Sequence, residues 1–302
     1  MSLATDGPLA PLSSLHTHSR YDDGEGEIGD YAAAASCAGL SAYGASGHAP
    51  LPFDCDYAMP LATLDTYCDD VRKVAERWED RLAVYLGLEL DYVPGLSSFY
   101  EREFLGRGFD YFVASVHYVG DPGTVPWAYD ESEDVFIREI QSRHAGDSRP
   151  VVEDYYSRLC AMVREVANWG VPSFVGHFDR IALWNRDDRY FPTSDSWYLA
   201  LVDEALNAIQ SAGMAIELNT SGWTKPAAKP NPNLTVLRRS VERRIPLIVS
   251  ADAHQASKVA RLYREAVELL RKAGYGEVIV PNHTGWRRAV LSAEKGSEAP
   301  SA

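Results

Sequence analysis

The chain has 302 residues, 46% of them hydrophobic, and a formal net charge of −14. This composition is typical of a globular protein and excludes a disordered chain, a collagen-like fibre and a coiled coil. An acidic surface repels phosphates and anionic lipids at long range, so we expect no membrane and no long nucleic acid among the partners. A small anionic substrate remains compatible with a local basic pocket.

Two further features bear on location. No window of 18 apolar residues occurs, and residues 1–12 lack the basic start and apolar core of a secretory signal. The four cysteines are too few for a disulfide scaffold, and none forms a CxxC pair. We therefore expect reduced thiols and a cytoplasmic protein.

The sequence leaves the oligomeric state open.

Short apolar runs alternate with amphipathic helical patterns along the chain. The runs are continuous, as in parallel strands that are covered on both faces. In chain order we predict strand 12–16, helix 28–38, strand 41–48, helix 63–80, strands 82–92 and 109–118, helix 151–169, strand 173–178, helix 195–212, strand 214–219, helix 234–243, strand 247–251 and helix 257–273. This order predicts a single barrel-like α/β domain over residues 13–290, between flexible ends at 1–12 and 291–302.

Six of the eight histidines lie at or just beyond the ends of predicted strands. They are His16, His18, His48, His117, His177 and His254, and Glu89 and Asp252 occupy similar positions. The carboxyl ends of parallel barrel strands open on one face, so these side chains are expected to converge there. Imidazole and carboxylate groups suit Zn²⁺, Fe²⁺ and Mn²⁺. The set exceeds the three or so ligands of one catalytic ion, which indicates two or three ions.

The segments that carry these residues resemble the successive motifs of the PHP (polymerase and histidinol phosphatase) superfamily, and they are most similar to those of its histidinol-phosphatases. The matching segments are His16–Ser19 (HTHS), Gly47–Pro50 (GHAP), Gly87–Gly95 (GLELDYVPG), Ser115–His117 (SVH), Gly176–Ile181 (GHFDRI), Glu217–Gly222 (ELNTSG) and Ser250–His254 (SADAH). No single motif is specific, but seven occur in order over most of the predicted domain.

This resemblance implies a distorted (β/α)7 TIM-like barrel with three divalent ions at its C-terminal face. It implies that His16, His18, Glu89 and Asp252 hold the first ion, that Glu89 bridges to a second held by His117 and His177, and that Asp23, His48 and His254 hold the third. Within this set we predict that Glu89, Asp252 and His254 act in catalysis. The adjacent Asp22 could replace Asp23 as the ligand. Zinc, iron and manganese all fit such donors.

A site of this kind suits the hydrolysis of phosphate monoesters. Two neighbouring ions lower the pKa of a shared water to about 7, so metal-bound hydroxide can attack the phosphorus at neutral pH. Arg180, three residues after His177, and Arg143, in the region after the fourth strand, are candidate phosphate clamps because guanidinium binds phosphate bidentately. A salt bridge at the barrel rim for Arg180, and a solvated loop charge for Arg143, are the alternatives.

The resemblance favours L-histidinol phosphate as the substrate, which places the reaction in histidine biosynthesis. Acids in the segment 119–150, namely Asp130, Glu131, Glu133 and Asp134, would then contact the cationic end of the substrate. Asp91 could orient a ligand histidine or make a purely structural hydrogen bond. The alternative functions are a phosphoesterase for another small phosphomonoester, a nucleotide or a short oligonucleotide, and a metal-binding module without catalysis.

Overall fold

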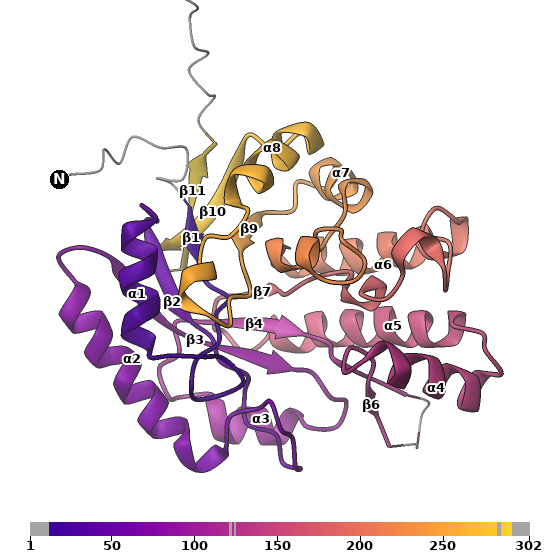
Figure 1. Ribbon diagram of the computed structural model, residues 1–302, viewed down its shortest axis with the longest axis horizontal. Helices are drawn as coiled ribbons and strands as arrows, with labels where there is room; N and C mark the ends of the chain where they lie inside the picture. The colour runs from indigo at the N-terminus through magenta and orange to yellow at the C-terminus, as the bar shows by residue number, and fades with distance from the viewer. Residues whose placement is uncertain (1–11, 121–122, 124, 283–284, 292–302) are drawn as a thin grey trace, which may run out of the picture.

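A seven-stranded parallel sheet forms the centre of the molecule (Figure 1). We describe it from a computed structural model, which covers residues 12–120, 123, 125–282 and 285–291. The strands follow the order β1 (Ser13–Ser14), β2 (Ala42–Ala45), β3 (Ala83–Asp91), β4 (Tyr111–Ser115), β7 (Ser173–Val175), β8 (Ala215–Asn219) and β9 (Leu247–Ser250). Each strand pairs in parallel with the next, as the continuous apolar runs predict.

The first and last strands of the sheet meet and nearly close it into a barrel. Thr17, just beyond β1, forms a parallel bridge with Ala253, just beyond β9. The amide of His18 donates to the Ala253 carbonyl at 3.0 Å, and the Ala253 amide donates to the His16 carbonyl at 3.2 Å. The distorted seven-stranded, TIM-like α/β barrel is thereby confirmed, and the two ends of the chain's motif series become neighbours.

Helices surround the sheet (Figure 1). They are α1 (Ile28–Cys37), α2 (Leu64–Trp78), α3 (Ser97–Phe104), α4 (Glu133–His144), α5 (Arg149–Val166), α6 (Ser196–Ala212), α7 (Leu234–Glu242) and α8 (Tyr263–Ala273). Local signals set their ends. The Ser132 side chain accepts from the Val135 amide at the start of α4, and the Asn233 side chain caps α7 in the same way. Gly213 and Gly274 end α6 and α8 in the left-handed conformation.

The structure departs from the predicted elements in four places. Helix α3 was not predicted. The segment between β4 and α5 contains β5 (Tyr118–Val119), β6 (Trp127–Ala128) and α4, where we expected a long loop. Helix α8 begins at Tyr263 rather than at residue 257, because a separate turn occupies Ala256–Lys258 and Leu262 has a φ of 59°. An antiparallel hairpin of β10 (Glu277–Asn282) and β11 (Gly285–Val290) follows α8.

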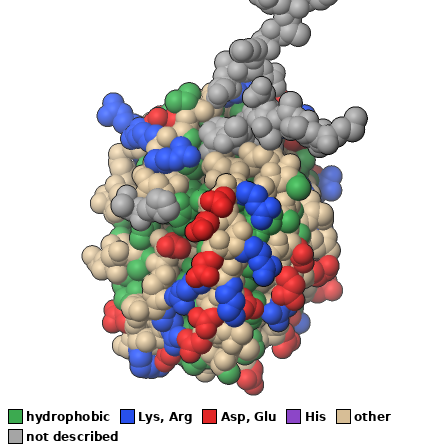
Figure 2. All heavy atoms as spheres, turned by 90° about the vertical axis from the view of Figure 1, so that its left-hand side faces the viewer, with side chains coloured by type: hydrophobic (Ala, Val, Ile, Leu, Met, Phe, Trp, Pro, Cys, Tyr) green, Lys and Arg blue, Asp and Glu red, His purple; other side chains and the backbone are tan. Residues whose placement is uncertain are grey.

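The predicted flexible ends fall almost entirely outside the described residues. The exceptions are Leu12 and Leu291, and both side chains are buried. Within the described part of the chain, no helix is long and apolar enough to cross a membrane. Acidic and basic side chains are interspersed on the face shown in Figure 2. The ion pair between Lys73 and Asp70 of α2 is one example of neighbouring opposite charges.

Apolar side chains fill the barrel at the N-terminal ends of its strands. Tyr111 of β4 stacks on Phe174 of β7, and Trp286 of β11 packs edge-on against both rings. Two glycines make room for Tyr111, since a Cβ at Gly44 or Gly87 would lie 2.3 or 2.2 Å from its side chain. The barrel is therefore closed at this end, and any site must open at the other.

Candidate metal centre

Toward the C-terminal ends of the strands, the side chains in the barrel interior are polar. Alternate residues of a strand point the same way. Along β4 the inward series runs from Tyr111 through Val113 to Ser115 and then His117. The Ser115 hydroxyl donates to Glu89 Oε1 of β3 at 2.6 Å. The alternation that places apolar side chains inside the closed end thus also places imidazoles and carboxylates inside the open end.

The first group of donors surrounds Glu89 Oε2. His16 Nε2 lies 3.0 Å from this oxygen and His18 Nε2 lies 3.4 Å from it. Asp252 Oδ1 completes the group, 3.1 Å from His18 Nε2 and 3.8 Å from His16 Nε2. All four side chains are buried. The structure therefore brings together the four residues that we expected around the first ion.

A second group lies on the other oxygen of Glu89. His177 Nε2 is 3.1 Å from Glu89 Oε1 and 3.2 Å from His117 Nε2. His117 Nε2 is 3.8 Å from Glu89 Oε1. His177 follows β7 with a φ of 25°, a backbone conformation that non-glycine residues rarely adopt. Each carboxylate oxygen of Glu89 therefore faces a different group of imidazoles, as expected of a side chain that bridges two metal ions.

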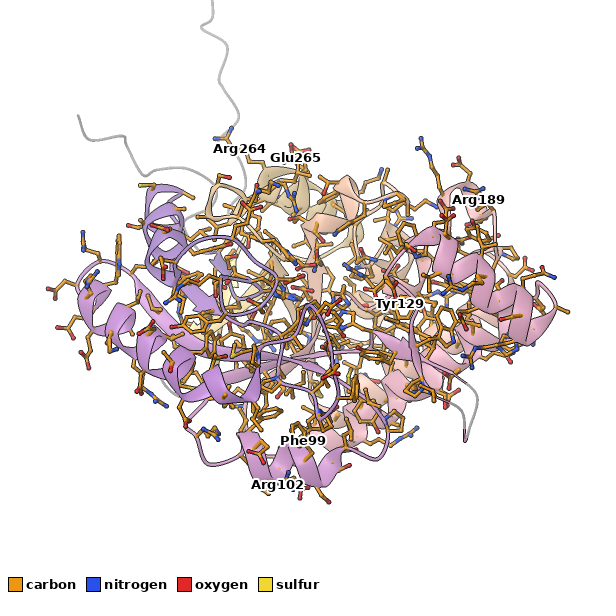
Figure 3. All side chains as sticks on the ribbon, turned by 60° about the horizontal axis from the view of Figure 1, so that its bottom comes forward. Phe99, Arg102, Tyr129, Arg189, Arg264 and Glu265 are labelled. Carbon is orange, nitrogen blue, oxygen red and sulfur yellow. The ribbon has the colours of Figure 1, made fainter. Side chains whose placement is uncertain are left out.

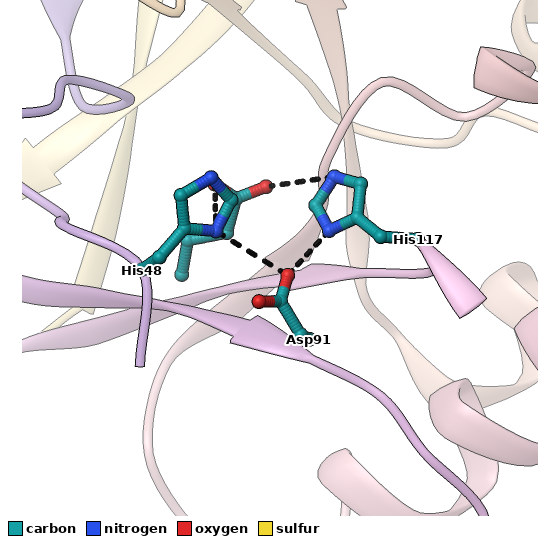
Figure 4. Close-up of side chains that lie close together, drawn as sticks. His48, Asp91 and His117 are labelled. Carbon is teal, nitrogen blue, oxygen red and sulfur yellow. Dashed lines mark hydrogen bonds and ion pairs between the residues drawn. The ribbon is translucent and has the colours of Figure 1, made fainter. Parts of the chain in front are cut away.

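The third predicted group is only partly assembled in the expected way. Asp23 Oδ2 lies 3.2 Å from His254 Nε2, and His18 shares this group. The Nδ1 atom of His48 lies 3.3 Å from both Glu89 and Asp91, and His48 is not among the three side chains whose ligand atoms come together here (Figure 4). The assignment of His48 to the third ion stays a prediction. Asp22 faces His18 rather than His254, so the geometry favours Asp23 over Asp22 in this group.

Carboxylates outside the predicted ligand set hold three of the histidine rings. Glu217 accepts from His16 Nδ1 at 2.8 Å, Asp22 accepts from His18 Nδ1 at 2.6 Å, and Asp91 accepts from His117 Nδ1 (Figure 4). In each case the Nε2 atom is left facing the centre of the cluster. Sequence reasoning raised this role for Asp91 but missed it for Glu217 and Asp22. The period of two in β8, which also turns Asn219 inward, is the signal that could have found Glu217.

The electrostatics of the cluster reflect buried opposite charges. Burial alone would lower the pKa of His16, but the charges of Glu89, Glu217 and Asp252 raise it well above its ordinary value. Burial likewise opposes ionisation of Glu89, but the surrounding imidazoles hold its pKa well below its usual range. Glu89 is therefore ionised at neutral pH, and its negative charge attracts cations.

Several buried nitrogens in this cluster make no hydrogen bond of normal geometry to the described residues, although His16 Nε2 and His18 Nε2 lie close to Glu89. They are His16 Nε2, His18 Nε2, His48 Nδ1 and His177 Nδ1. Buried polar atoms are rarely left unpaired, and an unmade bond of this kind indicates a missing ligand. Four groups of His, Asp and Glu side chains also place their ligand atoms within 4.8 Å of one another. The residues present therefore fit divalent metal ions, with more than one ion accommodated.

A cavity of about 620 Å³ opens over the cluster. Besides the predicted ligands, its lining includes the acids Asp56, Asp130, Glu131 and Glu139, the aromatic rings of Tyr57, Tyr118 and Trp127, and the cations Arg138, Arg180 and Lys225. The β6–α4 connection is fixed beside it, since Tyr129 points into the protein and donates to the Val116 carbonyl at 2.8 Å (Figure 3). The volume exceeds that of a phosphate ion and leaves room for an organic group.

The two predicted clamp residues have different positions. Arg180 lines the cavity, is largely buried, and pairs with Asp130 at 3.1 Å and Asp252 at 3.5 Å. Arg143 belongs to the last turn of α4, pairs with Glu139 at 2.8 Å and does not line the cavity. We expected Arg143 in a long loop after the fourth strand. The helix instead fixes it beside an acid at the i−4 position.

Comparison with known proteins agrees with this geometry. The family model described as PHP domain matches residues 14–221. The chain belongs to the PHP family. Among PHP relatives, the chain is 33% identical over 256 residues to "Probable histidinol-phosphatase" of Deinococcus radiodurans, covering 84% of this chain and 90% of the relative. It is 32% identical over 239 residues to histidinol-phosphatase of Bacillus subtilis, covering 73% of this chain and 84% of that one.

A solved structure supports the fold. Histidinol phosphate phosphatase of Lactococcus lactis, crystallised with zinc, L-histidinol and phosphate, superposes with a TM-score of 0.68. The match covers 91% of this chain and 98% of the other at 20% sequence identity. The PHP barrel seen here is therefore shared with a structure determined by experiment.

Proposed function

We propose that this PHP protein is a metal-dependent phosphomonoesterase that hydrolyses L-histidinol phosphate to L-histidinol and phosphate. The observation that carries the proposal is the set of buried imidazole nitrogens without partners that converge with carboxylates under one open cavity. The names of the relatives supply the substrate. The proposal makes the protein a phosphoric monoester hydrolase of histidine biosynthesis.

In this proposal three divalent ions occupy the cluster, with His16, His18, Glu89 and Asp252 around the first, Glu89, His117 and His177 around the second, and Asp23, His48 and His254 around the third. When bound, the ions supply Lewis acidity toward phosphate oxygens and toward a nucleophilic water. Glu89 contacts both inner groups through separate oxygens. Neutralising it would disturb both groups together.

Arg180 is the residue of this chain that we assign to phosphate binding. Burial opposes its charge, but the neighbouring Asp130 and Asp252 carboxylates raise the pKa of its guanidinium, so it stays protonated. A guanidinium has five N–H donors. The hydrogen bonds to Asp130 and Asp252 occupy only some of those of Arg180. The remaining donors can bind phosphate oxygens and stabilise charge that develops during attack.

The outer wall of the cavity suits the other end of the substrate. Its acids Asp56 and Glu131 have no ion-pair partner among the described residues, whereas Glu139 is already paired with Arg143. Glu133, one of the acids considered from the sequence, instead pairs with Arg189 at the outer edge of the molecule (Figure 3). The organic part of histidinol phosphate carries an amine and an imidazole. We propose that Glu131 attracts these groups while the aromatic rings contact the imidazole.

The test is a comparison of substrates on the purified chain. We expect the highest kcat/KM for L-histidinol phosphate, low activity on 5′-phosphorylated short oligonucleotides and other small phosphomonoesters, loss of activity after exhaustive chelation, and recovery on adding Zn²⁺, Mn²⁺ or Fe²⁺. A preference for the oligonucleotide would replace the substrate assignment. Activity that survives both chelation and His117→Ala would refute the metal mechanism.

A further inference from the structure

Two buried carboxylates each join a pair of the predicted ligand histidines. Glu217 and Asp22 lie outside the predicted ligand set, and their side chains are inaccessible to solvent. We infer that Glu217 and Asp22 are positioning residues that fix the tautomer of one histidine and the backbone of a second, and that they thereby determine how tightly the cluster holds its ions. The inference rests on the metal-dependent function proposed above and adds two residues to it.

Glu217 connects the ends of β1 and β7. Its Oε1 accepts from His16 Nδ1 at 2.8 Å, and its Oε2 accepts from the backbone amide of His177 at 2.8 Å. The Asn219 side chain also donates to Oε2 at 3.0 Å. His177 needs such support because its φ of 25° is unfavourable for a side chain with a Cβ. Glu217 therefore orients one ring and stabilises the strained backbone of another histidine.

Asp22 makes the equivalent connection between the ends of β1 and β2. Its Oδ2 accepts from His18 Nδ1 at 2.6 Å and from the His48 amide at 2.9 Å, and its Oδ1 accepts from the Ser19 amide at 2.8 Å. A Cβ at Gly47 would lie 3.1 Å from this carboxyl group, so the glycine permits the close approach. The two carboxylates thus repeat one arrangement at two places on the barrel mouth.

The chemistry of these contacts requires carboxylates. A carboxylate only accepts, so His16 and His18 must carry their proton on Nδ1, which leaves Nε2 free to ligate. Hydrogen bonds of this kind commonly orient metal-binding histidines and raise their basicity. In both residues each carboxylate oxygen faces at least one N–H donor. An amide has a single acceptor oxygen, so Gln or Asn in these places would direct an N–H against another N–H.

The test uses Glu217→Gln and Asp22→Asn in the full chain, loaded with zinc. We expect both variants to hold zinc about 10-fold or more weakly, as losses of orienting partners usually do. The measurements are zinc content per chain by mass spectrometry and the rate of zinc transfer to a chromogenic chelator. Wild-type zinc content and transfer rate in a folded Glu217→Gln variant would overturn the inference for Glu217, and the same result in Asp22→Asn would overturn it for Asp22.

A matched control is Asp179→Asn. Asp179 is equally buried, and both of its oxygens also accept, from the Asn231 side chain and from the Asn233 amide and side chain. Among the described residues, no histidine ring donates a hydrogen bond to Asp179. We expect this variant to lose thermal stability and to retain zinc with the wild-type transfer rate. If it also loses zinc, loss of any buried carboxylate near the site explains the effect and the positioning role fails.

Spectroscopy on the wild-type chain provides a second readout that does not depend on a variant folding. In ¹⁵N-histidine-labelled, zinc-loaded protein, we expect His16 and His18 to show Nδ1–H tautomers with Nε2 deprotonated. Nε2–H tautomers would overturn the inference. A wild-type chain that binds no zinc would instead refute the proposed function, so the two failures are distinguishable.

Discussion

The two ends of the barrel are built from the same strands but have opposite chemistry. At the N-terminal end Tyr111, Phe174 and Trp286 pack against one another within a cluster of apolar side chains. At the C-terminal end a few residues further along, the inward positions hold imidazoles and carboxylates with unpaired atoms. The same alternation of inward side chains therefore provides stability at one end and ligand binding at the other. Mutations at the open end should reduce activity, and mutations at the closed end should reduce stability.

The largest expected effect is at Glu89, the residue that contacts both inner groups of the open end. We predict that Glu89→Gln lowers kcat/KM for L-histidinol phosphate by about 10³-fold, at the upper end of the effect of removing a single electrostatic stabiliser. The variant should keep the wild-type far-UV circular dichroism spectrum, because the closed end is untouched. A loss of less than 10-fold would show that the open end does not depend on this bridging position.

The opposite result is expected at the closed end. Phe174 is fully buried, and we predict that Phe174→Ala lowers the free energy of unfolding by about 3–5 kcal/mol, since truncating a buried ring loses its burial and leaves a cavity. Urea denaturation measures this change. At a temperature where the variant is folded, kcat/KM should stay within about twofold of wild type. A large kinetic defect in the folded variant would mean that the two ends are coupled.

The difference between the ends also explains what the sequence could predict. Continuous apolar runs and helix-ending glycines located the seven strands and most helices, because these signals are local. The convergence of His16, Glu89 and Asp252 followed from strand topology alone. The hairpin β10–β11, which closes the apolar end, has no ligand-bearing motif and was not predicted. Its role depends on packing against Tyr111 and Phe174, which lie far away in sequence.

Side-chain partners were harder to predict than the site itself. Glu217 and Asp22 are identified by which histidine nitrogen they meet, and that depends on the closure of β1 against β9. The position of Arg143 could not be predicted because α4 was not predicted, and the helix pairs Arg143 with Glu139. The sequence therefore predicted which side chains could bind metal ions at the open end. Which carboxylates hydrogen-bond to those histidines could be seen only in the three-dimensional structure.

A comparison of Arg180 with Arg143 tests which arginine binds the phosphate group at the open end. We predict that Arg180→Ala lowers kcat/KM by about 10²-fold, a typical cost for removing one donor aimed at developing charge. Arg143→Ala should stay within about twofold, because its guanidinium is paired on α4 outside the cavity. Steady-state kinetics with histidinol phosphate measure both. Equal defects in the two variants would indicate a general charge effect instead of a phosphate contact.

The smallest expected effect concerns the outer wall of the cavity, where acids face solvent. Glu131 lines the cavity, whereas Glu133 pairs with Arg189 and lies outside it. We predict that Glu131→Gln raises KM for histidinol phosphate about threefold, with kcat unchanged, because exposed charges interact weakly through water. The increase should shrink at high ionic strength, since salt screens such attraction. Glu133→Gln removes the same charge and should leave KM unchanged. If both variants raise KM equally, the net charge of the segment matters and Glu131 makes no specific contact with the substrate.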